Sequence, residues 1–124
     1  MTTSFTEYRE LAKSLGVDAL ALVPGPNFTR ALGQGFMSHE RPFVLVIPAQ
    51  GAPAAIVPNL ELGSWDLVGF DGAVFDWRDQ DGYQAAFAAL AGHMPMTRLA
   101  VEGQVMRVFV HHALKQASPE LEII

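Results

Sequence analysis

The chain has 124 residues, of which 50% are hydrophobic and 17% charged, with a formal net charge of −5 at pH 7. This length predicts one domain, and the composition argues against a disordered chain. The eight Lys and Arg residues are scattered along the sequence, which argues against a nucleic-acid partner. There is no cysteine, so disulfides and thiolate chemistry are excluded.

No stretch of the sequence is typical of a targeting signal or a membrane span. The N-terminus lacks a basic region followed by an apolar core, and no apolar run approaches the roughly 20 residues that cross a bilayer. We therefore expect a cytoplasmic protein without a membrane partner. The high apolar fraction and the low charge also predict self-association, as a homodimer or a larger homo-oligomer.

The first predicted element is a helix over residues 5–15. Its apolar side chains recur at spacings of three and four, which is the period of one helical face. Ser4 is the expected N-cap, Glu7 completes a capping box, and Gly16 is the natural stop.

A buried strand and a loop follow this helix. Residues 19–23 form a short apolar run that Pro24-Gly25-Pro26 ends. Asn27 is expected to cap a short helix over residues 28–32. Residues 33–40 then form a glycine-flanked loop.

The stretch from Arg41 to Glu61 organises the rest of the chain. Apolar runs over residues 43–48 and 54–58 flank a turn that contains Gly51, which predicts a β-hairpin. The first run has no polar residue at any alternate position, so both of its faces must be covered. It therefore belongs in the middle of a layered α/β domain.

The remaining segments alternate between helices and strands. Residues 73–77 alternate in polarity, which is typical of a strand near an edge. The pattern predicts an α/β domain with a six-stranded mixed sheet flanked by helices. Its later elements are helices over residues 60–68, 83–91 and 104–117 and strands over residues 73–77, 99–101 and 121–124.

The residues that commonly carry chemistry form no convincing site. His111 and His112 are adjacent on a helix and diverge by about 100°. A dinucleotide loop, a Walker A loop and a nucleophile elbow are absent. Asp76, Asp79 and Asp81 could do acid–base or metal work in a cleft, but capping and solvation are the favoured roles.

Large apolar residues near loops offer a different kind of site. Phe36 and Met37 lie in the loop over residues 33–40, where no helical or strand period applies. Exposed, they would form a contact patch. Core packing is the alternative, as it is for Trp65 and Trp77.

Several short motifs, in order and spread over the whole chain, resemble one family. The sequence resembles the N-terminal domain of the creatinase, prolidase and aminopeptidase P family, the pita-bread metallopeptidases. The motifs are Gly16-Val17-Asp18-Ala19-Leu20, Pro24-Gly25-Pro26-Asn27-Phe28, residues 40–48, Val57-Pro58-Asn59-Leu60-Glu61, Trp77-Arg78-Asp79, and Leu99-Ala100-Val101-Glu102-Gly103 with Met106.

The resemblance implies a ribonuclease-H-like three-layer fold and catalysis in another domain. In this family a C-terminal domain holds a dinuclear divalent metal with two Asp, one His and two Glu. Residues 1–124 would then be the N-terminal domain alone, without the catalytic domain, and no metal or other cofactor is expected in this chain. The chain's own C-terminal catalytic domain is an implied partner.

The resemblance also implies that this domain mediates subunit contacts and selects substrate. Its loop after the first strand and short helix, here residues 34–41, reaches toward a partner subunit's active site. The family's Tyr-Leu-Thr-Gly-like run before that loop is here Arg30-Ala31-Leu32-Gly33, which lacks the aromatic residue. Phe36, Met37, His39 and Arg41 are the candidate gating or partner-contact residues.

Arg41 has two possible roles. Its guanidinium suits a substrate carboxylate, with His39 as a second donor that adds pH dependence. Alternatively Arg41 pairs with an internal acid such as Glu61 and ties the hairpin ends together, which we favour slightly.

We expect a non-catalytic N-terminal domain that serves oligomerisation and substrate gating in a creatinase-like or Xaa-Pro peptidase-like protein, inactive on its own. One alternative is a stand-alone α/β module that binds a protein or ligand without a peptidase. The other is a small carboxylate-dependent hydrolase, which is disfavoured because the strand over residues 19–23 has no carboxylate.

Overall fold

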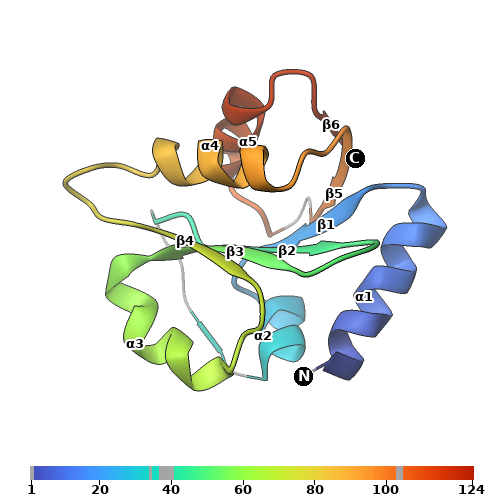
Figure 1. The fold of residues 1–124 in the computed structure, drawn as a ribbon, viewed down its shortest axis with the longest axis horizontal. Coiled ribbons are helices and arrows are strands. Elements are labelled where there is room, and N and C mark those ends of the chain that lie inside the picture. Colours follow the sequence, from blue (N-terminus) through green and yellow to red (C-terminus); the bar gives the residue numbers. More distant parts are fainter. Residues whose placement is uncertain (1, 34, 37–40, 103–104) are drawn as a thin grey trace.

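The computed structural model describes residues 2–33, 35–36, 41–102 and 105–124 (Figure 1). Helices and strands alternate along the chain, as the sequence pattern predicts. The elements are α1 (Thr2–Leu15), β1 (Ala19–Leu22), α2 (Pro26–Leu32), β2 (Val44–Pro48), β3 (Ala54–Pro58), the 3₁₀ turn η1 (Asn59–Glu61), α3 (Leu62–Trp65), the 3₁₀ turn η2 (Asp66–Val68), β4 (Ala73–Trp77), α4 (Gln84–His93), β5 (Arg98–Val101), α5 (Val108–Ala117) and β6 (Glu122–Ile123).

The six strands form one mixed sheet in the order β4-β3-β2-β1-β5-β6. The pairs β1–β2 and β2–β3 are antiparallel, and the pairs β1–β5, β3–β4 and β5–β6 are parallel. In Figure 1, α1, α2 and α3 cover one face of the sheet, and α4 and α5 cover the other. The predicted fold class, an α/β domain with helices on both faces of a six-stranded sheet, is confirmed.

Alternation along β2 divides the core into two layers. All five residues of β2 are buried. Leu45 and Ile47 belong to the core beneath α1, α2 and α3, whereas Val44 and Val46 belong to the core beneath α4 and α5. A strand with both faces covered needs apolar residues at every position, which explains the uninterrupted apolar run.

The structure corrects two predicted helix caps. Helix α1 begins at Thr2, so Ser4 lies inside the helix and is not its N-cap. Glu7 instead accepts a hydrogen bond of 2.6 Å from Arg30. Helix α2 begins at Pro26 after Gly25, and the side chain of Asn27 accepts a hydrogen bond from Tyr8 and donates one to Glu102 rather than capping the helix.

The later elements follow the sequence pattern with shifted ends. Residues 59–68 form two 3₁₀ turns around the short helix α3, and Gly69 ends them at φ 68°, a left-handed conformation that favours glycine. Helix α5 begins at Val108 rather than at residue 104, which lies outside the described residues. Within the part of the chain that the structure describes, no helix has the length and apolarity required to cross a membrane.

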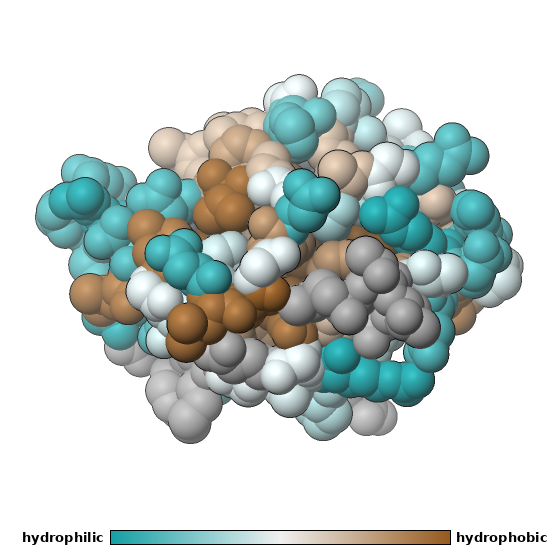
Figure 2. Space-filling model, turned by 60° about the horizontal axis from the view of Figure 1, so that its bottom comes forward, coloured by the Kyte–Doolittle hydropathy of each residue, from teal (hydrophilic) through white to brown (hydrophobic). Residues whose placement is uncertain are grey.

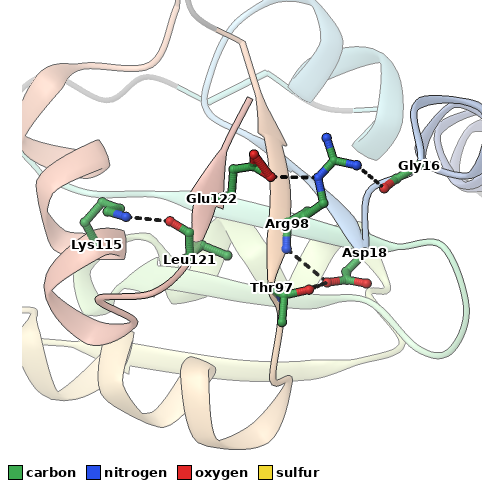
Figure 3. A network of polar contacts seen from close by, with 7 residues as sticks. All are labelled: Gly16, Asp18, Thr97, Arg98, Lys115, Leu121 and Glu122. Atoms are coloured by element: carbon green, nitrogen blue, oxygen red, sulfur yellow. Dashed lines mark hydrogen bonds and ion pairs between the residues drawn. The ribbon is translucent and has the colours of Figure 1, made fainter.

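A carboxylate fastens β1 to β5 at their amino ends (Figure 3). Asp18 Oδ2 accepts hydrogen bonds from Thr97 N at 2.7 Å, Thr97 Oγ1 at 3.0 Å and Arg98 N at 3.1 Å. The Arg98 side chain in turn donates to Glu122 in β6 and to the carbonyl of Gly16. The two backbone donors lower the pKa of Asp18 below its ordinary value, because they stabilise the ionised form.

Candidate functional site

A partly open pocket of about 160 Å³ lies where β3 and β4 end. Because these strands are parallel and Pro58 pairs with Trp77, the residues that follow both strands meet at one edge of the sheet. The start of β2 lies at the same edge, because β2 runs antiparallel to β3. The pocket is lined by Arg41, Pro58, Asn59, Leu60, Trp77, Arg78, Asp79 and Gln80.

Arg41 and Asp79 form a two-point ion pair at this pocket. Arg41 Nε donates to Asp79 Oδ1 at 2.9 Å, and Arg41 Nη2 donates to Asp79 Oδ2 at 2.7 Å. The two side chains are 41% and 54% exposed. Hydrogen bonding by the guanidinium, reinforced by its charge, lowers the pKa of Asp79 below its ordinary value.

Trp77 anchors the backbone next to Arg41. Its indole Nε1–H donates a buried hydrogen bond of 3.1 Å to the carbonyl oxygen of Pro42. The Trp77 ring also meets the Tyr83 ring edge to face, with centroids 5.7 Å apart. A buried carbonyl is costly to leave without a donor, so this bond fixes the position from which Arg41 projects.

The remaining polar groups of the pocket differ in the hydrogen bonds and ion pairs that they form. Asn59 Nδ2 donates to Asp76 Oδ2 at 3.3 Å. The backbone carbonyl of Arg78 accepts hydrogen bonds from the amides of Asp81 and Gly82, which closes the turn after β4. The side chain of Arg78 is exposed and forms no ion pair within the described residues.

The described candidate residues lie at two places. Arg41 forms its ion pair with Asp79, whereas Glu61 lies in η1 and forms no ion pair in the described part of the chain. Phe36 is half-buried, not exposed, and packs on the core beneath α1, α2 and α3. Its ring centroid lies 4.9 Å from that of Phe43. Met37 and His39, the other two candidates, lie outside the described residues.

Two residues of this pocket were not among the predicted site residues. Asp79 was expected to be a capping or solvated residue, and its role is instead the ion pair with Arg41. Arg78 was not predicted to be a site residue, although it lines the pocket together with Arg41. The available signal was positional: the parallel pairing of β3 and β4 brings the polar residues after each strand to one place.

The described residues do not fit a dinuclear metal site. No group of three or more His, Cys, Asp or Glu side chains in the described ranges is placed to hold an ion. The adjacent rings of His111 and His112 have centroids 6.3 Å apart and lie on α5, on the far side of the sheet from α3. The pocket at the ends of β3 and β4 thus offers guanidinium groups rather than metal ligands.

The sequence matches a known protein family over most of its length. The model of the Creatinase/Prolidase N-terminal domain matches residues 6–124. The probable dipeptidase PepE of Mycobacterium tuberculosis is 32% identical over 84 residues, which are 65% of this chain and 22% of that protein.

Solved structures agree in fold. The creatinase/prolidase N-terminal domain of an X-Pro dipeptidase from Streptococcus pyogenes superposes with a TM-score of 0.87 at 17% identity, over 100% of this chain and 93% of that one. Dipeptidase PepE from Mycobacterium ulcerans gives a TM-score of 0.78 at 27% identity, over 99% of this chain and 33% of that one. The chain therefore matches only about a third of that dipeptidase, and by sequence and fold it belongs to the Creatinase/Prolidase N-terminal domain family.

Proposed function

We propose that this chain is the accessory N-terminal domain of a dipeptidase-like protein, where it joins subunits and helps to admit substrate to a separate catalytic domain. The family and the dipeptidase relatives support the assignment. Hydrolysis, and the metal pair that it requires, belong to the catalytic domain in this proposal. The described residues of the chain contribute contacts and charge.

The placement of Arg41 carries the gating part of the proposal. Arg41 ends the loop over residues 34–41, and its guanidinium lines an open pocket at the edge of the sheet. The buried Trp77–Pro42 hydrogen bond holds the neighbouring backbone, and Asp79 orients the guanidinium fork. A fixed, half-exposed guanidinium is suited to meet a substrate carboxylate from a neighbouring subunit or domain.

Exposed leucines support the assembly part of the proposal. Leu60 and Leu67, in the turns on either side of α3, are 71% and 78% exposed. Figure 2 shows apolar side chains gathered on the side of the molecule where α3 lies in Figure 1. Apolar side chains that are this exposed are typical of a surface that another domain or subunit covers.

Steady-state kinetics of the full-length protein test the gating role. Arg41→Ala should raise KM for dipeptides with a free carboxylate, because the contact binds substrate before reaction. Arg30→Ala is the matched control, since Arg30 is also exposed and also forms an ion pair, with Glu7. An unchanged KM in the Arg41 variant, or an equal rise in the Arg30 variant, would remove Arg41 from the substrate path.

Sedimentation over a concentration series tests the assembly role. Leu67→Asp should shift the protein toward monomer, because it places a charge in the covered surface. Val108→Asp is the control, since Val108 is 70% exposed but lies on α5, on the opposite face of the sheet. A protein that is monomeric throughout, or that responds equally to both variants, contradicts the proposal.

A further inference from the structure

We propose that Arg78, with Arg41 beside it, binds the carboxylate of a small ligand that carries an apolar group next to that carboxylate, and that Asp79 competes for Arg41 from within the chain. This deepens the gating proposal by naming the ligand chemistry of the same pocket. It rests on the proposed function only for the pocket's place on a substrate path. Binding itself is a property of this chain and can be measured without a catalytic domain.

Among the charged side chains around the pocket, Arg78 is the one that we expect to bind the ligand carboxylate first. Arg41 and Asp79 neutralise one another through two hydrogen bonds, whereas Asp76 keeps its negative charge and accepts a hydrogen bond from Asn59. Arg78 lines the same pocket, is exposed and has no ion-pair partner in the described ranges. The pocket therefore presents one guanidinium whose charge no described ion pair offsets, next to a second guanidinium that already holds a carboxylate.

Asp79 shows which ligand group the pocket accepts. Its carboxylate meets the Arg41 fork at 2.9 and 2.7 Å, the geometry with which arginine recognises a carboxylate. Asp79 is 54% exposed. Its carboxylate can therefore leave Arg41 and be solvated by water at little cost when another carboxylate approaches. In this proposal an incoming carboxylate bridges Arg78 and Arg41, which line the same pocket, whereas Asp79 pairs with Arg41 and forms no ion pair with Arg78 in the described ranges.

The apolar lining selects among carboxylates. Leu60 is 71% exposed and lines the pocket together with Pro58 and Trp77. A ligand whose carboxylate lies next to an apolar group would cover Leu60 while its charge meets Arg78. The C-terminal residue of a short apolar peptide has this arrangement, whereas the side-chain carboxylate of a glutamic acid residue has only two methylene groups beside it.

A titration followed by the two indole N–H signals tests the binding. N-acetylleucine is the probe, and N-acetylleucinamide is its uncharged match. We expect N-acetylleucine to shift the Trp77 indole signal saturably, with a dissociation constant of roughly millimolar order because so small a ligand makes few contacts. The Trp65 indole signal, in the core beneath α1, α2 and α3, should stay in place. The amide should shift neither.

Substitutions assign the roles within the pocket. Arg78→Gln should weaken N-acetylleucine binding about tenfold, because it removes one charged arm of the clamp. Asp79→Asn should tighten binding by about threefold, since the internal competitor loses its charge. Arg107→Gln is the control, because Arg107 is exposed beside a cavity of only about 20 Å³.

Four results would overturn the proposal. They are no saturable shift of the Trp77 signal, equal binding of the amide, unchanged affinity in a folded Arg78→Gln protein, and equal binding of an acetylated glutamic acid α-amide, whose only carboxylate is on its side chain. Thermal unfolding of each variant shows that it is folded, and Arg78→Lys, which keeps the charge but loses the fork, should bind with intermediate affinity. Saturable binding together with an unchanged KM for Arg41→Ala in the full-length protein would overturn the gating proposal. The carboxylate-binding proposal for the pocket would still hold.

Discussion

Arg41 and Asp79 connect the segment before β2 to the segment after β4 through hydrogen bonds of 2.9 and 2.7 Å, although β3 lies between these strands. The Trp77–Pro42 hydrogen bond makes the same connection from a buried position. One edge of the sheet thus holds together three strand ends that are distant in sequence. The exposed link and the buried link differ in how much they should stabilise the fold.

The exposed link should contribute little to stability. Arg41→Ala and Asp79→Asn should each lower the melting temperature only within the range of ordinary surface substitutions, because both side chains are about half exposed. The double variant should be no less stable than either single variant, since each removes the same interaction. Thermal unfolding of the four proteins checks this, and a large loss in Arg41→Ala alone would show a structural role beyond the pair.

The buried link should matter more. Trp77→Phe leaves the Pro42 carbonyl without its indole donor, and we expect a loss of about 1–3 kcal/mol in the free energy of unfolding. Trp65→Phe is the matched control, because Trp65 is equally buried and contacts aromatic rings but has no indole hydrogen bond in the described structure. Urea unfolding followed by circular dichroism compares the two, and equal losses would show that ring volume, not the hydrogen bond, is what matters at Trp77.

The Asp18 fastening gives a pH dependence with a defined sign. Its pKa is lowered in the folded state, so its contribution to stability is present above the ordinary value of 3.8 and is lost as pH falls through the folded-state pKa. Asp18→Asn should therefore be less stable than the parent near neutral pH, and the difference should shrink as the solution is acidified below that value. Urea midpoints of both proteins at several pH values measure this, and a gap that stays constant with pH would contradict it.

Much of the fold could be predicted because local patterns determine it. The unbroken apolar run over residues 43–48 required a strand covered on both faces, and β2 is buried in the middle of the sheet. The alternation of residues 73–77 indicated a strand near an edge, and β4 is an edge strand. These predictions depend only on which faces of a strand meet water.

The pocket could not be predicted because it depends on strand order. Within the sequence Glu61 is the acid that ends the same hairpin, whereas Asp79 follows Arg41 by 38 positions. Only the parallel pairing of β4 with β3 brings Asp79 to the start of β2. The sequence placed the candidate gating residues within residues 34–41. The polar groups that complete the pocket, Arg78 and Asp79, instead follow the C-terminal end of β4.

Phe36 packs on the core in this structure, and a substitution can distinguish this packing role from a role in subunit contact. Its ring centroid lies 4.9 Å from that of Phe43, 6.0 Å from that of Phe28 and 6.0 Å from that of Trp65, all in tilted or edge-to-face arrangements. Phe36→Ala removes these contacts from a half-buried site, so we expect a loss of about 1–3 kcal/mol in the free energy of unfolding. Leu60→Ala is the control, because Leu60 is 71% exposed and should leave stability nearly unchanged.

The same pair of variants reports on association. Phe36 packs on the core, whereas the Leu60 side chain is exposed to solvent. Leu60→Ala should therefore weaken self-association in sedimentation experiments without lowering the unfolding midpoint. Phe36→Ala should lower the midpoint, and at temperatures where it stays folded it should associate as the parent does. If Phe36→Ala instead kept its stability and lost association, Phe36 would be the subunit contact and its packing on Phe43 would count for little.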